Sequence, residues 1–109
     1  KKISLYGNGE GKRTFTHISD ICNILFNSVT KPLKNNEVYN IGGEEYSLFE
    51  VANKIAEKYS SEIEFVKWPK TSLMLETGDT IFNSEKLDSE INYKSYESLE
   101  IWIEKINQK

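Results

Sequence analysis

The chain contains very little cysteine, proline and arginine: one Cys, two Pro and one Arg beside 13 lysines in 109 residues. The single Cys22 has no partner for a disulfide within the chain, which excludes a disulfide-stapled secreted scaffold and favours the cytoplasm. No apolar run approaches the ~18–20 residues that cross a bilayer, so no membrane partner is expected. The net charge is −3 with acids and lysines interspersed, which argues against a dedicated nucleic-acid binder.

The length and composition predict one small domain, or a piece of one, over residues 1–109. Hydrophobic residues make up 38% of the chain, below the roughly 45–50% of ordinary globular proteins. The core is therefore expected to be thin, as in a small α/β module or one that leans on a partner surface.

Apolar periodicity gives the expected elements. Alternation predicts strands at 3–6, 37–41, 63–66 and 80–82, and an extended piece at 15–18. Helical spacing predicts a helix capped by Ser19 or Asp20, a helix behind the capping box Ser47–Glu50, and a helix from 96 to 106. A further short helical turn is expected after 83–84, and the apolar patch 73–75 is left unassigned. The order β-β-α-β-α-β-β-α predicts a mixed α/β fold.

Three of the six glycines lie at Gly7, Gly9 and Gly11, just before Arg13. The spacing does not fit a dinucleotide fingerprint, which needs G-x-G-x-x-G opening into a helix, nor a P-loop, whose Gly-Lys is followed by Ser or Thr. The guanidinium of Arg13 can grip a carboxylate or phosphate with paired donors. Spacing alone leaves two interpretations open, a solvent-facing arginine and an anion contact.

The other polar candidates indicate structural roles. His17 has no ligand partner at metal-binding spacing, so no metal site is expected, and it is interpreted as a structural histidine. Cys22 is expected to be a buried thiol on a helix face rather than part of a Cys-His nucleophile. Asp20 could be a catalytic carboxylate, but a helix cap is the simpler interpretation. On these interpretations no residue of the chain is catalytic.

Four blocks, in order, resemble the extended short-chain dehydrogenase/reductases, the NAD-dependent nucleotide-sugar epimerases and dehydratases. The first joins the strand and glycine turn of 3–9 to Arg13-Thr-Phe-Thr-His-Ile-Ser-Asp-Ile21, and the second is Glu37-Val-Tyr-Asn-Ile-Gly-Gly43 with the helix behind it. The third is Thr80–Leu87, and the fourth is the closing helix with Trp102. The resemblance implies the C-terminal, substrate-binding portion of such a Rossmann-type enzyme, without its dinucleotide-binding part.

The same resemblance implies how a nucleotide sugar would bind. Ser4 and Tyr6 would lie along the base, Arg13 would contact the diphosphate, and Asp79 would meet the ribose. Many family members carry arginines where this chain has Leu75 and Glu76, so a second phosphate contact is absent here or is replaced by a lysine such as Lys67 or Lys70.

The family's catalytic Tyr-x-x-x-Lys pair is absent, because no tyrosine of this chain has a lysine four residues later. The resemblance therefore implies a chain that is catalytically silent alone and binds no cofactor by itself. NAD(P) is expected in the full-length enzyme, held by an N-terminal Rossmann part that would also be this chain's partner. The alternative is a stand-alone, non-catalytic module, descended from such an enzyme, that binds a nucleotide or a protein.

Overall fold

The computed structural model describes residues 1–31, 33, 36–91 and 97–106. The elements follow in the order β1 (Lys2–Tyr6), β2 (Lys12–Phe15), α1 (Ile18–Thr30), β3 (Glu44–Ser47), α2 (Leu48–Tyr59), β4 (Glu62–Val66), α3 (Lys70–Leu75), α4 (Glu85–Glu90) and α5 (Leu99–Lys105). This arrangement confirms the mixed α/β fold expected from the sequence.

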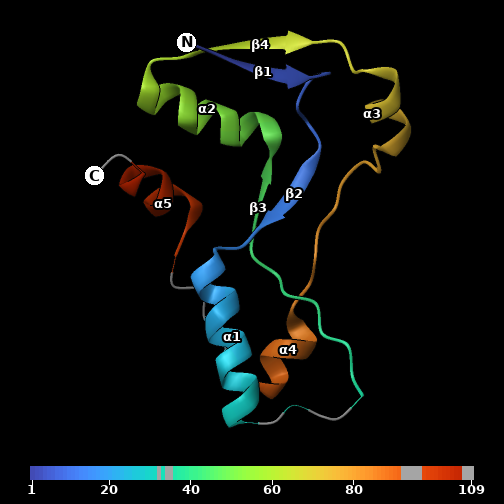
Figure 1. The fold of residues 1–109 in the computed structure, drawn as a ribbon, viewed down its shortest axis with the longest axis vertical. Coiled ribbons are helices and arrows are strands. Elements are labelled where there is room, and N and C mark those ends of the chain that lie inside the picture. The colour runs from blue at the N-terminus through green and yellow to red at the C-terminus, as the bar shows by residue number, and fades with distance from the viewer. Residues whose placement is uncertain (32, 34–35, 92–96, 107–109) are drawn as a thin grey trace.

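Two small sheets organise the molecule. β1 and β4 pair in parallel, with Tyr6 opposite Val66, and β2 and β3 pair antiparallel, with Arg13 opposite Tyr46. Figure 1 shows the β1–β4 pair at one end of the molecule, with α2 beneath it, and the β2–β3 pair running away toward α1 and α4. Because β1 and β4 are parallel, their carboxyl ends lie at the same edge, next to α3.

The end of the molecule around α2 is held by local and long-range contacts. Ser47 caps α2 in a capping box, its hydroxyl accepting from the Glu50 N–H at 3.1 Å and the Glu50 carboxylate accepting from the Ser47 N–H at 2.7 Å. The helix contacts β1, β4 and α5. Ala52 and Ala56 of α2 are buried, and so is Ile103 of α5.

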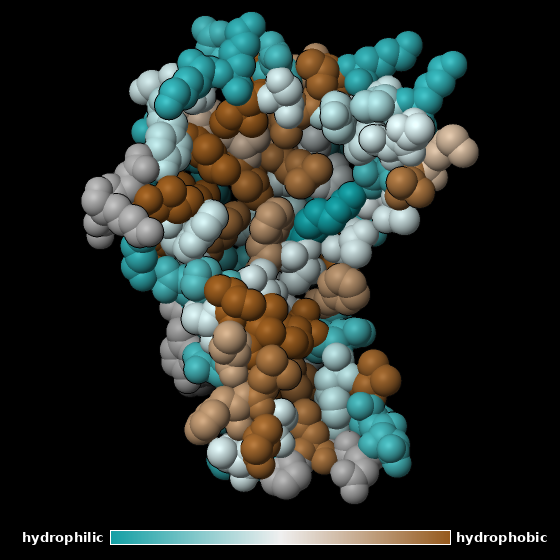
Figure 2. Space-filling model, in the orientation of Figure 1, coloured by the Kyte–Doolittle hydropathy of each residue, from teal (hydrophilic) through white to brown (hydrophobic). Residues whose placement is uncertain are grey.

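The other end of the molecule has its own small core. Ile24 of α1 packs with Leu87 of α4 and with Ile91, and the half-buried Tyr39 and Ile41 lie against this cluster. Leu87 is only 1% exposed. One face of α1 remains uncovered among the described residues: Leu25, Phe26 and Val29 are 59%, 69% and 80% exposed. Figure 2 shows hydrophobic surface gathered over this end.

The whole molecule is extended. Its solvent-accessible surface is 8207 Å², about a third more than the roughly 6,200 Å² expected for a folded monomer of this mass. Its radius of gyration is 16.9 Å, against about 13 Å for a compact domain of this length. The expectation of a thin core is thus consistent with the observed shape.

Several sequence-based expectations are wrong in detail. Residues 37–41 form no strand with any described residue; they are held instead by Lys86, which contacts Glu37 at 2.6 Å and the Val38 carbonyl at 2.8 Å. The expected extended piece at 15–18 begins earlier, as β2, and residues 80–82 contribute only an isolated bridge between Thr80 and Arg13. A strand requires a neighbouring strand to bond with, which a local pattern cannot supply.

Four further points concern helices and burial. The cap of α1 is His17, whose Nδ1 accepts from the Ser19 N–H at 3.2 Å, so the expected cap at Ser19 or Asp20 is wrong; Asp20 is fully buried in the first turn of the helix. Cys22 is exposed, because it lies on the uncovered side of α1. Residues 73–75 belong to α3. The closing helix is confirmed over Leu99–Lys105, and the start expected for it at 96 lies outside the described residues.

Candidate functional site

Arg13 lies in β2 beside the loop that follows α3. Its Nη1 donates to the carbonyl oxygens of Lys12 at 2.8 Å and Gly78 at 2.6 Å, and its Nη2 donates to the Glu76 carboxylate at 2.8 Å. Both side chains of the Arg13–Glu76 pair are about a quarter exposed. The bond from Arg13 lowers the pKa of Glu76 below its ordinary value, and the Gly78 N–H adds to this effect.

The same loop is bonded to the backbone of β2. The Asp79 carboxylate accepts from the Lys12 N–H at 2.8 Å, the Thr80 N–H donates to the Lys12 carbonyl at 2.9 Å, and the Thr14 N–H donates to the Thr80 carbonyl at 3.2 Å. These bonds bring Arg13 and Asp79, two of the residues predicted for the site, to one place although 66 positions separate them in the sequence. They also fix the guanidinium against the loop.

Tyr6 ends β1 and packs against Trp68, which follows β4. Their ring centroids lie 5.2 Å apart at an angle of 40°. Gly7, with φ +63°, lets the chain turn beneath this pair, because a Cβ at Gly7 would come within 2.5 Å of the indole nitrogen. Tyr6 is 47% exposed, so the aromatic pair presents an open surface at the carboxyl edge of the β1–β4 sheet.

Ser4 lies on the same strand and is engaged by its neighbour. Its hydroxyl donates to Glu64 of β4 at 2.7 Å, and Lys2 bonds the same carboxylate at 3.2 Å. The Ser4 hydroxyl and then Lys2 lower the pKa of Glu64. The predicted residues thus form two groups: Ser4 and Tyr6 on β1, and Arg13 with Asp79 at β2.

Two residues that bear on the candidate site were not predicted for it. Trp68 carries no sequence signal beyond being one of two tryptophans, and only the parallel register of β1 and β4 places it beside Tyr6. Glu76 stood out only as a departure from the family pattern. Its contact with Arg13 spans 63 positions, a distance at which spacing carries no information.

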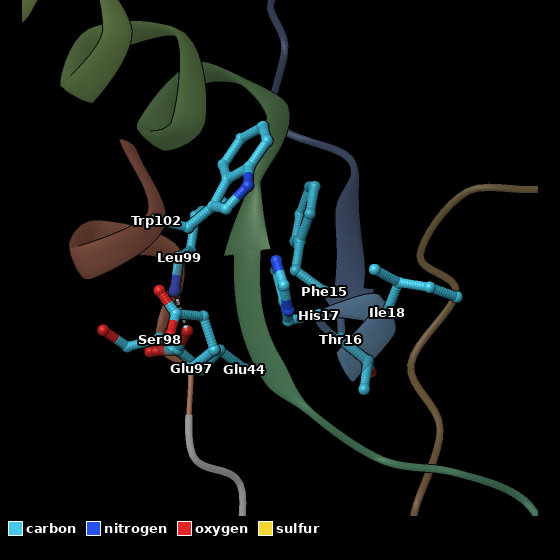
Figure 3. A pocket seen from close by; sticks show the side chains of 9 residues that line it. All are labelled: Phe15, Thr16, His17, Ile18, Glu44, Glu97, Ser98, Leu99 and Trp102. Carbon is cyan, nitrogen blue, oxygen red and sulfur yellow. Dashed lines mark hydrogen bonds between the residues drawn. The ribbon is translucent and has the colours of Figure 1, made fainter. Parts of the chain in front are cut away.

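A separate cavity of about 310 Å³ lies between the β2–β3 pair and the start of α5. Figure 3 shows Phe15 and His17 lining it from one side and Trp102 from α5 lining it from the other. Glu44 points a carboxylate oxygen at the Leu99 N–H, 2.6 Å away, and so anchors the start of α5. None of the residues predicted for the site lines this cavity.

Other kinds of site find little support in the part of the chain that the structure describes. The turn of Gly7, Gly9 and Gly11 leads into β2, so it does not present the helix N-terminus that a dinucleotide fingerprint requires. No group of three or more His, Cys, Asp or Glu side chains among the described residues could hold a metal ion. Within the same residues no helix is long and apolar enough to cross a membrane.

No protein-family model matches the chain, and no curated protein matches it. Solved structures do match. The dTDP-glucose 4,6-dehydratase of Bacillus anthracis, solved in complex with NAD, is 28% identical with a TM-score of 0.81, over 96% of this chain and 33% of that one.

Two other enzymes show the same likeness. The UDP-glucose 4-epimerase of Thermotoga maritima, solved with UDP-glucose, is 21% identical with a TM-score of 0.76, over 94% of this chain and 32% of that one. A GDP-6-OMe-4-keto-L-xylo-heptose reductase from C. jejuni is 24% identical with a TM-score of 0.75, over 94% of this chain and 32% of that one.

The chain spans about a third of the length of each of these solved structures. They include a dehydratase, an epimerase and a reductase of nucleotide sugars, which is the family that the four sequence blocks indicated. In fold, the chain therefore corresponds to about one third of an extended short-chain dehydrogenase/reductase of the kind that acts on nucleotide sugars.

Proposed function

We propose that this chain is the nucleotide-sugar-binding portion of an NAD(P)-dependent nucleotide-sugar epimerase, dehydratase or reductase, and that it is catalytically silent alone. The observation that carries the proposal is the fixed guanidinium of Arg13. Three of its five N–H groups are bonded within the chain, and the other two have no partner among the described residues. A guanidinium held in this way offers paired, permanently charged donors to a diphosphate.

The aromatic pair supplies the second contact. A nucleobase stacked on an aromatic side chain gains about 1–3 kcal/mol, and Tyr6 with Trp68 offers such a face. α3, six residues long and therefore on the order of 9 Å from end to end, joins Trp68 to Glu76 beside Arg13. A nucleoside diphosphate would then place its base at one end of α3 and its phosphates at the other.

Asp79 completes the arrangement. One of its carboxylate oxygens accepts from the Lys12 N–H, which orients the side chain and leaves the second oxygen for a ribose hydroxyl. NAD(P) would be held by other residues of the full enzyme, because the glycine turn of this chain opens on a strand. The chemistry of hydride removal and return belongs to that cofactor and to the Tyr-x-x-x-Lys pair that this chain does not contain.

The test is a titration of the chain with UDP and with dTDP, followed by amide ¹H–¹⁵N NMR. We expect shifts at Tyr6, Arg13 and Asp79, and an increase of at least tenfold in Kd for the Arg13→Ala variant. Lys86→Ala is the matched control, because Lys86 also forms an ion pair, with Glu37 at 2.6 Å, on another part of the chain. Unchanged nucleotide affinity in Arg13→Ala would refute the diphosphate contact.

A further inference from the structure

The guanidinium of Arg13 already has an anion bound to it. We propose that Glu76 is an internal counter-ion that neutralises Arg13 and sets the affinity of this site for phosphate-bearing ligands. The inference rests on the proposed function, since it concerns the same guanidinium. The Nη2–Oε1 distance of 2.8 Å makes this a close, charge-assisted contact.

The partial burial of Arg13 and Glu76 strengthens the electrostatic interaction between them. Exposed ion pairs are strongly screened by water and salt, and the Lys2–Glu64 and Lys86–Glu37 pairs are of that kind, with side chains 40% or more exposed. The side chains of Arg13 and Glu76 are only 26% and 24% exposed. Their charges therefore act on each other, and on any anion brought beside them, more strongly than those of the two exposed pairs.

The position of Glu76 is fixed by the loop as well as by Arg13. Its Oε1 accepts from the Gly78 N–H at 3.0 Å, and the Gly78 carbonyl accepts from Arg13 Nη1 at 2.6 Å. The carboxylate thus cannot turn away from the guanidinium without breaking bonds on both sides. A phosphate that bonds to the remaining N–H groups of Arg13 lies within a few ångströms of this fixed negative charge, and the repulsion weakens its binding.

Other charged residues lie on this loop or precede it in the sequence. Asp79, on the same loop, adds a second carboxylate beside β2. Lys67 and Lys70, which lie between β4 and Glu76 in the sequence, form no ion pair with a described residue. The fixed cation of this site, the Arg13 guanidinium, is thus paired with a fixed anion, the Glu76 carboxylate.

The decisive variant is Glu76→Gln. Glutamine has the same shape and keeps an amide oxygen that can accept from Arg13 and from the Gly78 N–H, so the loop geometry is retained while the negative charge is removed. We expect the Kd for UDP, measured by calorimetry at low salt, to fall by five- to tenfold relative to the unmodified chain. The Kd for inorganic pyrophosphate should fall by a similar factor, and the gain should shrink as salt is raised.

Two controls separate this effect from a general change in charge. Glu37→Gln removes the same charge from another ion pair, and we expect its Kd for UDP to stay within twofold of the unmodified chain. The double variant Arg13→Ala, Glu76→Gln should bind UDP no better than Arg13→Ala, because the gain depends on the released guanidinium. An equal gain in the Arg13→Ala background, or in Glu37→Gln, would overturn the counter-ion role.

The outcomes also separate this inference from the function on which it rests. If the unmodified chain binds UDP through Arg13, but Glu76→Gln binds equally well or more weakly, the counter-ion role is refuted and the nucleotide site stands. If neither the unmodified chain nor Glu76→Gln binds UDP or pyrophosphate, the diphosphate contact itself is refuted. Amide NMR shifts of Gly78 in Glu76→Gln show whether the loop has kept its place, and Glu76→Ala provides a second uncharged variant with the same expected gain.

Discussion

Replacing Leu87 with alanine tests the small core that joins α1 to α4. The Leu87 side chain is 1% exposed and packs with Ile24 and Ile91, so the substitution removes three fully buried carbons. At about 0.8 kcal/mol for each, the lost transfer free energy is about 2.4 kcal/mol. A cavity term adds to it, within the 2–5 kcal/mol range of such substitutions. We expect a loss of about 3 kcal/mol in the free energy of unfolding.

The measurement is urea unfolding followed by circular dichroism, with a thermal melt in parallel. A loss of this size should lower Tm by roughly 12–24 °C, at 4–8 °C per kcal/mol for a domain of this size. The matched control is Leu25→Ala, which removes the same atoms from a helix but at a side chain that is 59% exposed. Its expected cost is below about 0.5 kcal/mol. A cost below about 1 kcal/mol for Leu87→Ala would refute the assignment of the core.

Two further predictions concern local features. Ser47→Ala removes the capping hydroxyl of α2 and should cost about 1 kcal/mol of stability at neutral pH. The same cap affects Glu50, because hydrogen bonds from the Ser47 N–H and then from its hydroxyl lower the pKa of the Glu50 carboxylate. A lowered carboxylate pKa gives stability that is present above the pKa of Glu50 in the unfolded chain and is lost as pH falls through its pKa in the folded chain. The Ser47 N–H that bonds this carboxylate is kept in Ser47→Ala, so most of the loss toward pH 3 in urea should be common to the variant and the unmodified chain. The thiol of Cys22 is exposed and should react with a small thiol reagent in the folded chain as completely as in denaturant; protection in the native state would contradict this.

Local chemistry made parts of the fold readable from the sequence. The capping box of Ser47 and Glu50 predicted α2, and both of its hydrogen bonds are present. The strands at 3–6 and 63–66 were predicted by alternation and are found as β1 and β4. In each case the signal lies within a few neighbouring residues, and the same residues determine the structure.

The errors arise where the deciding partner is distant. Residues 37–41 have the composition of a strand, yet Lys86 bonds to Glu37 and Val38 instead, 49 and 48 positions away. Similarly, Arg13 was predicted to contact a diphosphate, while Glu76, which forms an ion pair with it at 2.8 Å, was noted only as a departure from the family pattern. A sequence shows which charges are available, but only the fold shows which of them are paired.

The uncovered face of α1 gives this extended molecule apolar surface that another surface can cover. A chain with about a third more surface than a compact monomer, and with Leu25, Phe26 and Val29 exposed side by side on one helix, has apolar area available for contact. The Leu25→Ala control reports on this face as well. If the face is free in solution, the substitution costs little; if another surface covers it, the cost rises toward that of Leu87→Ala and depends on protein concentration when the cover is a second copy.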